Sequence, residues 1–320
     1  MKIDYSNKKV LLIGGGGTIG TYIAKELLEL GSSVDIICLE DYKSDNDNLR
    51  YFNAKVTLDY LKGFLADKHY DAIANLLHYD VPEDYIAAHM VIAPKTDHEI
   101  FFSSIRAVGN EQHPISETAP TILDLYESGK FTDTKFVEND SYSISKSRCE
   151  RYLRQVSKFK NWTIVRPMIN SSDKRLDIVV YTFDEPVIYA KEGKTMYIAD
   201  HVKDKVAGLE WAGNTGKMIA HLMFKEHCMG RTYMLTTGHR MTWGEVADIY
   251  TDLLGLKVEW MPREEYWAKF GSFRFPTEYD RAYNREADPT LILKDTGLSL
   301  TDFTAFKEGI RIELKKLGAI

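Results

Sequence analysis

Residues 9–20 read KVLLIGGGGTIG, which is a largely apolar run followed by a row of glycines. A run of this kind, ending at glycine, is typical of a buried strand in a parallel sheet. The next segment, residues 21–30, has apolar side chains at helical spacing and stops at Gly31, and residues 34–39 form a second apolar run. The three segments predict a strand, a helix and a strand joined by a right-handed crossover.

The glycine row has a direct physical use at this junction. Glycines permit a tight turn with close backbone approach, and the free N–H groups at the start of a helix bind a pyrophosphate. Two registers fit, with glycines at positions 14, 17 and 20 or at positions 15, 17 and 20. A flexible surface turn is the alternative, but it does not explain the flanking strand and helix. We expect a dinucleotide to bind at Gly14, Gly16, Gly17, Thr18, Ile19 and Gly20.

The choice between NAD and NADP depends on the residue that meets the adenosine ribose. An acidic residue about 20 positions after the glycines accepts the ribose hydroxyls of NAD, whereas an arginine suits the 2′-phosphate of NADP. Glu40 stands at this distance from Gly20, with Asp41 beside it, and no arginine precedes Arg50. We expect Glu40 to bind the ribose of NAD, and NADP stays open. The alternative is that Glu40 is merely solvated.

Strands and helices continue to alternate along the chain. Strands are expected at residues 54–57, 72–77, 99–103, 162–165 and 232–236, and helices at 58–68, 82–91, 141–157, 201–212, 217–225, 242–254 and 303–317, with 110–140 irregular. This alternation predicts an α/β fold: a Rossmann-type, doubly wound parallel sheet with a smaller, mixed α/β C-terminal substrate domain. We expect the dinucleotide-binding domain at 1–168, with 200–240 returning to it, and the substrate domain at 169–199 and 241–320.

Composition and charge disfavour several classes of protein. The 320 residues carry a formal net charge of −6, which argues against nucleic acid as a partner because phosphate neutralisation needs a basic face. No apolar stretch approaches the roughly 20 residues of a membrane span, and residues 1–9 lack the apolar core of a secretion signal. Cys38, Cys149 and Cys228 form neither a disulfide framework nor a zinc pattern. We expect a cytoplasmic chain with no metal site and no membrane partner.

A tyrosine and a lysine four residues apart are candidates for acid–base chemistry. Tyr142 and Lys146 fall on one face of the helix expected at 141–157. The ammonium group there can favour the phenolate and lower the pKa of the tyrosine toward the working pH. Three other pairs have the same spacing but lack a strong helix: Tyr5 with Lys9, Tyr51 with Lys55, and Tyr126 with Lys130.

A strand that ends in two serines supplies a second component. Residues 101–109 read FFSSIRAVG, and the carboxyl end of a strand in a parallel sheet faces the ligand crevice. A serine hydroxyl at that place can hydrogen-bond the substrate oxygen whose proton the tyrosine takes. The alternative role for Ser103 and Ser104 is to cap the end of the strand.

In order and rough spacing, these motifs resemble those of extended short-chain dehydrogenases/reductases. The likeness is greatest to the NAD-dependent epimerase/dehydratase family of nucleotide-sugar enzymes, as a divergent member. It rests on the glycine row, the SSIRAVG strand end, Tyr142-x-x-x-Lys146 and Val165-Arg166-Pro167. Residues 201–207 resemble the returning helix of that family and residues 242–245 the start of its substrate-domain helix, so the likeness covers nearly the whole chain.

The resemblance implies roles for individual residues. Tyr142 would be the general acid/base, Lys146 would hold the nicotinamide ribose and tune Tyr142, and Ser104 would orient the substrate oxygen. The chain also departs from the family: residues 168–172 (MINSS) replace its usual Tyr-Gly-Pro element, and the segment before Tyr142 is long. The cofactor acid of the family stands nearer to Cys38 than to Glu40. A homodimer is a further expectation from the resemblance.

Three functions stay open at this point. The leading hypothesis is an NAD(P)-dependent oxidoreductase, epimerase or dehydratase that acts by hydride transfer on a hydroxyl or ketone of a nucleotide-activated sugar or similar metabolite. The MINSS stretch and the aromatic residues after Trp260 suggest a carbonyl reductase of an apolar or aromatic small molecule as the second. The third is a catalytically idle cofactor-binding protein that binds RNA or protein. Arg281 is a candidate contact for a substrate diphosphate, with a surface salt bridge as its alternative.

Overall fold

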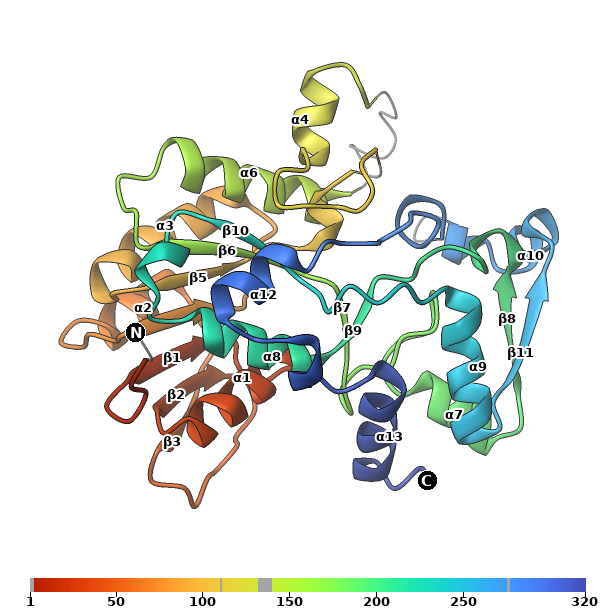
Figure 1. Ribbon diagram of the computed structural model, residues 1–320, viewed down its shortest axis with the longest axis horizontal. Coiled ribbons are helices and arrows are strands. Elements are labelled where there is room, and N and C mark those ends of the chain that lie inside the picture. Colours follow the sequence, from red (N-terminus) through yellow and green to blue (C-terminus); the bar gives the residue numbers. More distant parts are fainter. Residues whose placement is uncertain (1–2, 110, 132–139, 275–276) are drawn as a thin grey trace.

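The computed structural model describes residues 3–109, 111–131, 140–274 and 277–320. Figure 1 shows a larger part, in which helices cover a central sheet, and a smaller part that holds α9, α10, β8 and β11. None of the helices formed by the described residues is long and apolar enough to span a membrane.

The larger part is built on a seven-stranded sheet in which neighbouring strands are parallel. The strand order is β10-β6-β5-β4-β1-β2-β3, which is the Rossmann order with one strand added. Because the order reverses between β1 and β4, the crevice for a ligand is expected at their carboxyl ends. The predicted fold class is confirmed. The strands are β1 (Lys9–Ile13), β2 (Ser33–Cys38), β3 (Leu49–Asn53), β4 (Ala72–Asn75), β5 (Glu99–Phe102), β6 (Trp162–Pro167) and β10 (Thr232–Leu235).

Apolar side chains on both faces of this sheet build its two main cores. In β1, Val10 and Leu12 pack on one face and Leu11 and Ile13 on the other, because alternate residues of a strand point in opposite directions. The first face is covered by α1 (Thr18–Glu29), α8 (Ala212–Leu222) and α12 (Thr290–Thr296). The second is covered by α2 (Leu58–Phe64), α3 (Pro82–Ile92) and α6 (Ser141–Gln155).

The smaller part has a core of its own. In it, β8 (Thr195–Ala199) pairs in parallel with β11 (Lys257–Met261), and the surrounding helices are α7 (Glu185–Lys191), α9 (Trp243–Leu254), α10 (Arg263–Lys269) and α13 (Phe306–Lys316). A capping box of Thr242 and Glu245 begins α9, and Gly255 ends it in a left-handed conformation. A short parallel pair, β7 (Ile169–Ser171) and β9 (Leu209–Trp211), lies between the two parts (Figure 1).

Three expected elements differ in the structure. The helix expected at 201–212 is wrong: a 3-10 turn, η3 (Asp200–Val202), leads into β9. Gly208 explains this, since its φ of +64° is left-handed and a Cβ there would lie 2.2 Å from that of Arg285. The third strand is β3 rather than 54–57, because the pairing with β2 ends at Asn53. A capped helix, α4 (Ile122–Glu127), stands in the stretch expected to be irregular.

One element also lies outside its expected domain. The helix α12 falls within the range 241–320 that the sequence assigned to the substrate domain, but Ile292 packs into the core between α1, α8 and the sheet. Asp295, on the same helix, accepts hydrogen bonds from Tyr233 in β10 and from Arg231 beside it. The C-terminal segment therefore returns to the larger part before it forms α13.

Candidate active site

The glycine loop joins β1 to α1 at the point where the strand order reverses. Gly14 has a φ of +74°, and its N–H donates to the carbonyl oxygen of Ile37 at 2.8 Å, which turns the chain after β1. A Cβ on Gly20 would lie 2.3 Å from the carbonyl oxygen of Gly15, so glycine is needed for α1 to pack against the loop. Gly17, the N-cap residue, has no side chain to cap the helix start, and an anion can take that place.

A cavity of about 660 Å³ opens beside this loop. Gly14, Gly16 and Gly17 form part of its lining, and apolar side chains between Ala54 and Leu61 form another part. The carboxylate of Glu40 reaches back to the loop, because a Cβ on Gly16 would lie 2.6 Å from Glu40 Oε2. The structure therefore places Glu40 beside three of the glycines predicted to bind a cofactor.

A second cavity, of about 290 Å³, begins at the start of α1 on the other side of the loop. It brings together five residues predicted from the sequence, which are Thr18, Ile19, Ser104, Tyr142 and Arg281. Residues 167–170 form another part of the lining, so the MINSS stretch, where the sequence departs from the family pattern, contributes directly to this cavity.

Local hydrogen bonds hold the serine and the tyrosine in place. Ser104 follows β5 and caps a 3-10 turn, η2 (Ile105–Ala107), by accepting from the N–H of Arg106 at 3.1 Å. Tyr142 stands in the first turn of α6, where Asp140 accepts from the N–H of Ser143 at 3.1 Å. The guanidinium of Arg106 pairs with Asp140 at 3.0 Å, and this pair joins the two elements.

The surroundings of Tyr142 favour a neutral phenol. Burial raises the pKa of Tyr142, while a hydrogen bond with Ser104 and the positive charges of Arg106 and Arg175 partly offset this effect. The expected lowering of this pKa by Lys146 stays a prediction for the chain with its cofactor bound. The cations that act on the phenol are arginines, because the Lys146 ammonium is directed toward backbone carbonyls instead.

Lys146 is buried between the ends of β4 and β5. Its Nζ donates to the carbonyl oxygen of Phe102 at 2.7 Å and to that of Leu77 at 3.4 Å, and it lies 5.8 Å from the centre of the Tyr142 ring. Burial lowers the pKa of Lys146 to about 8. Leu77 also lines the larger cavity, so Lys146 contacts a residue of that cavity, although Lys146 is not among the described lining residues of either one.

A histidine ring contacts the ring of Tyr142. The ring of His78, from the loop after β4, has its centre 4.8 Å from that of Tyr142, and His78 also lines the larger cavity. Its Nε2 lies 2.9 Å from a carboxylate oxygen of Asp80. Burial and the positive charge of Lys146 lower the pKa of His78, so its imidazole is mainly neutral at pH 7.

Arg281 borders the small cavity, but its own hydrogen bonds hold it firmly. Its Nε donates to the carbonyl oxygen of Val179 at 2.6 Å and its Nη1 to Asp280, and its guanidinium lies over the ring of Trp243. Burial alone would raise the pKa of Asp280, but Arg281, Arg106 and Arg285 outweigh it and hold this pKa below its usual range.

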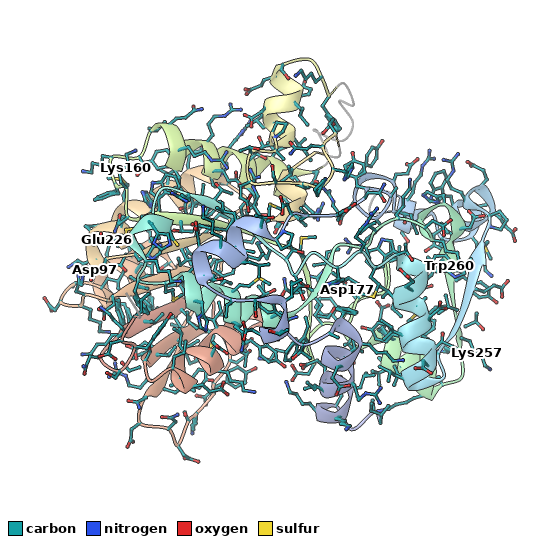
Figure 2. All side chains as sticks on the ribbon, viewed as in Figure 1. Asp97, Lys160, Asp177, Glu226, Lys257 and Trp260 are labelled. Carbon is teal, nitrogen blue, oxygen red and sulfur yellow. The ribbon has the colours of Figure 1, made fainter. Side chains whose placement is uncertain are left out.

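Three basic residues at these cavities were missed in the sequence. Arg106 and Arg175 line the small cavity, and Lys174 donates from the loop after β7 to the carbonyl oxygen of Gly16. Arg106 follows Ser104 by two residues, which was a usable local signal. No local signal in the sequence marked Lys174 or Arg175, because only the fold brings the loop after β7 to the glycine loop. Asp177, which pairs with Arg175 at 2.6 Å, lies between the two parts of the molecule (Figure 2).

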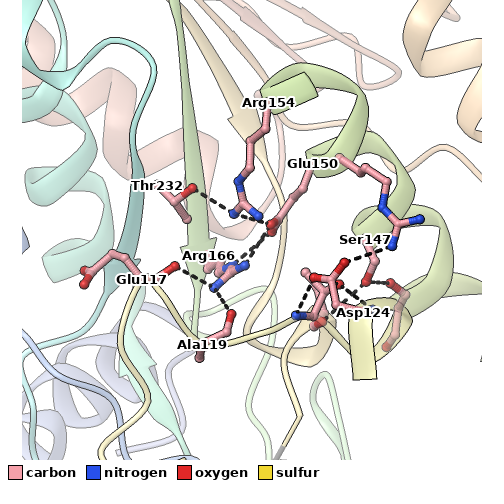
Figure 3. Close-up of polar contacts among 12 residues, drawn as sticks. Glu117, Ala119, Asp124, Ser147, Glu150, Arg154, Arg166 and Thr232 are labelled. Carbon is pink, nitrogen blue, oxygen red and sulfur yellow. Dashed lines mark hydrogen bonds and ion pairs between the residues drawn. The ribbon is translucent and has the colours of Figure 1, made fainter. Parts of the chain in front are cut away.

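A buried ion pair anchors the helix that carries the tyrosine. Arg166, in β6, donates to both carboxylate oxygens of Glu150, in α6, at 2.9 and 2.8 Å (Figure 3). Both side chains are fully buried, and Arg154 adds a further contact to Glu150 at 2.7 Å. Arg166 also donates to the carbonyl oxygens of Glu117 and Ala119, so the segment before α4 is fixed by the same group.

Among the described residues, one group could offer three ligands to a metal ion. Atoms of His227, Cys228 and Asp295 lie within 4.8 Å of one another. The Asp295 carboxylate already accepts from Tyr233 at 2.7 Å and from Arg231 at 3.1 Å, and the arginine charge opposes a cation there. This group belongs to neither of the two cavities at the glycine loop.

Comparison of the sequence with family models gives no match, and neither does comparison with curated proteins. Solved structures are similar over nearly the whole chain. The epimerase Mth375 of Methanothermobacter thermautotrophicus has a TM-score of 0.75 at 14% identity, covering 98% of this chain and 93% of that one. WbmG of Bordetella bronchiseptica, solved with NAD and UDP, has a TM-score of 0.69 at 17% identity, covering 98% and 96%.

A third similar structure is that of an enzyme solved with a sugar nucleotide. The UDP-glucose 4-epimerase of Thermotoga maritima, solved with UDP-glucose, has a TM-score of 0.68 at 15% identity, covering 97% of this chain and 98% of that one. This chain has the same fold as these three enzymes. The resemblance read from the sequence motifs is thus confirmed at the level of the fold.

Proposed function

We propose that this chain is an NAD-dependent oxidoreductase, epimerase or dehydratase that acts on a hydroxyl or ketone of a nucleotide-activated sugar or a similar polar metabolite. One observation carries the proposal: Ser104 and Tyr142 border the same small cavity as Thr18 and Ile19, which begin the helix after the glycine loop. WbmG and the Thermotoga maritima epimerase, with the same fold, were solved with NAD and UDP and with UDP-glucose.

The residues around the larger cavity fit the adenosine half of NAD. A Cβ on Gly17 would meet no atom within 4 Å, which leaves room for a pyrophosphate at the start of α1. Glu40 would accept the ribose hydroxyls, and Arg50, the nearest arginine in the sequence, is engaged with Asp35 at 2.7 and 2.9 Å. Lys55 also lines this cavity, so a comparison of NAD with NADP is the direct test of cofactor choice.

Bound NAD would supply the acceptor and donor of a hydride at a carbon that carries oxygen. In the reducing direction the neutral phenol of Tyr142 donates its proton to the substrate oxygen, and Ser104 orients that oxygen by a hydrogen bond. In the oxidising direction Tyr142 must act as the base, and the charges of Arg106 and Arg175 favour the phenolate that this requires. Lys146, four residues after Tyr142 on the same helix, would hold the nicotinamide ribose.

Two other functions have less support. A carbonyl reductase of an apolar substrate fits less well, because Arg106, Arg175, Arg281 and Asp280 give the small cavity four charged side chains. A catalytically idle binding protein would have no need to keep Ser104 and Tyr142 together at the start of α1. The arrangement is the one that acid–base catalysis requires, with a proton donor and a hydrogen-bonding hydroxyl facing one site.

Replacement of Tyr142 by phenylalanine tests the proposed chemistry. Tyr142→Phe removes the proton donor and keeps the ring, so we expect turnover to fall by about 10²–10⁴-fold while NAD binds nearly as before. Activity on a panel of nucleotide sugars would be followed by NADH absorbance and by product analysis. Tyr126→Phe is the matched control, because Tyr126 also precedes a lysine by four residues but lies half-exposed in α4. Undiminished turnover by Tyr142→Phe would contradict the mechanism.

A further inference from the structure

Basic side chains gather at the small cavity that Ser104 and Tyr142 border. Arg106, Arg175 and Arg281 line it, whereas Asp280 is the one acidic residue among its described lining residues. Asp140 and Asp177 pair with Arg106 and Arg175 from outside that lining. A neutral sugar gives such a cavity no reason to carry three guanidinium groups.

The carboxylates that pair with these arginines are nearly inaccessible, including that of Asp280, which lines the cavity. The side chains of Asp140, Asp177 and Asp280 are 2%, 0% and 6% exposed, whereas those of Arg106 and Arg175 are 30% and 40% exposed. The buried carboxylates therefore orient the guanidinium groups and leave positive charge toward the cavity. Among the described residues, Nη1 of Arg106 and Nη1 of Arg175 have no hydrogen-bond partner, so each has donors left for a ligand.

Arg281 differs from these two arginines. Its side chain is 9% exposed, its Nε donates to Val179 and its Nη1 donates to Asp280. It contributes positive charge to the cavity, but its own hydrogen bonds hold it in the cavity lining. Arg106 and Arg175 are the side chains that a ligand can reach.

The position of Arg106 ties the charge to the reacting end of the substrate. Its guanidinium carbon lies 5.1 Å from the centre of the Tyr142 ring, and its backbone N–H is bonded to Ser104. At about 290 Å³ the cavity is at the lower limit for ligand pockets, so it has room for a sugar-sized unit rather than a whole nucleotide sugar. An anion held by Arg106 therefore lies on the unit whose oxygen meets Tyr142.

We propose that the substrate carries an anionic group, a carboxylate or a phosphate, on the unit that reacts, and that Arg106 and Arg175 bind it. This inference rests on the proposed function and narrows its substrate class. The planar guanidinium matches both anions through paired hydrogen bonds, which are stronger than those of neutral partners. A diphosphate bound elsewhere along the substrate would not by itself account for charge next to Tyr142.

Calorimetric titration of the NAD-loaded chain with matched ligand pairs tests the inference. UDP-glucuronate is compared with UDP-glucose for the carboxylate, and glucose 6-phosphate with glucose for the phosphate, with UDP alone as the reference for the diphosphate. We expect the acid of at least one pair to bind about 10–100-fold more tightly than its neutral partner. We expect Arg106→Gln and Arg175→Gln each to remove most of that preference.

Arg240→Gln is the control, because Arg240 is an exposed arginine that pairs with Glu286 away from this cavity. If Arg106→Gln unfolds the chain because it breaks the pair with Asp140, Arg175→Gln still tests the inference. Equal binding of acid and neutral partner in both pairs would overturn the inference, as would UDP binding as tightly as UDP-glucuronate. NAD binding is measured first in the same experiment, so failure of the proposed function is recognised separately, by the absence of that signal.

Discussion

The buried charge of Lys146 lowers the stability of the folded chain. Its ammonium group is buried and donates to the carbonyl oxygens of Phe102 and Leu77. These hydrogen bonds do not replace the lost hydration, and the pKa of Lys146 falls to about 8. A basic group whose folded pKa lies below its unfolded value destabilises the fold while it is charged. The structure therefore predicts a conflict between stability and function at this residue.

Substitution of Lys146 by methionine measures that conflict. We expect Lys146→Met to raise the free energy of unfolding at pH 7 by about 1–2 kcal/mol, because the buried charge is removed and the chain length is nearly kept. The difference should shrink as the pH rises from 8 toward 10.5, since wild-type Lys146 then loses its proton in the folded state but not in the unfolded state.

Urea denaturation at pH 7 and at pH 9.5 compares the two proteins. The control is Lys62→Met, at a lysine whose side chain is 56% exposed in α2. A variant that is less stable than wild type at pH 7, or a difference independent of pH, would contradict the account of Lys146.

The approach of α1 to the glycine loop is decided at a single glycine. We expect Gly20→Ala to displace α1 from the loop, because the new Cβ would lie 2.3 Å from the carbonyl oxygen of Gly15. Overpacking of this kind typically costs about 1–3 kcal/mol, and the NAD affinity should fall with it. Gly63→Ala in α2 is the control: its Cβ meets nothing within 4 Å, and alanine favours a helix. Thermal unfolding and NAD titration of both variants measure the loss of stability and of NAD affinity. Unchanged NAD affinity in Gly20→Ala would count against this loop as the binding site.

The attachment of α6 to the sheet depends on the buried pair of Glu150 and Arg166 (Figure 3). We expect Glu150→Gln to lower the free energy of unfolding by about 3–5 kcal/mol, because it leaves the Arg166 charge buried without a partner. The double variant Glu150→Leu with Arg166→Met should recover much of this loss, since no unpaired charge remains.

Denaturant titration measures these effects. Glu29→Gln, which breaks an exposed pair with Lys25 in α1, is the control and should change stability by less than about 1 kcal/mol. A loss as small as that control in Glu150→Gln would show that the buried pair does not anchor α6.

At the scale of the whole molecule, specific polar contacts join the smaller part to α1, β9 and the glycine loop. Glu313 in α13 accepts from Trp211 Nε1 at 2.7 Å and from Tyr22 in α1, and Lys174 donates to Gly16. The small cavity is lined by residues of α1, of η2 and α6, and of the segments around Arg175 and Arg281. Its shape therefore depends on how the two parts pack against each other.

Local pattern explains what could be predicted from the sequence. The order of strand, glycines, helix and strand predicted the parallel sheet, because β1 is apolar on both faces, with Val10 and Leu12 on one and Leu11 and Ile13 on the other. Ser104 and Tyr142 could be paired because both follow local signals, at a strand end and in a helix. Arg175 could not be assigned to the site, since only the fold brings its segment to Tyr142. The prediction of a helix at 201–212 was wrong because of Gly208, whose close contact with Arg285 depends on the fold and cannot be read from the local sequence.

The most direct test of the account is a calorimetric titration of the nucleotide-free chain with NAD and with NADP. We predict one NAD bound per chain, and an NADP affinity lower by about tenfold or more, because the carboxylate of Glu40 would repel a 2′-phosphate. No heat of binding with NAD, or tighter binding of NADP than of NAD, would contradict the claim that the glycine loop and Glu40 form an NAD site beside Ser104 and Tyr142.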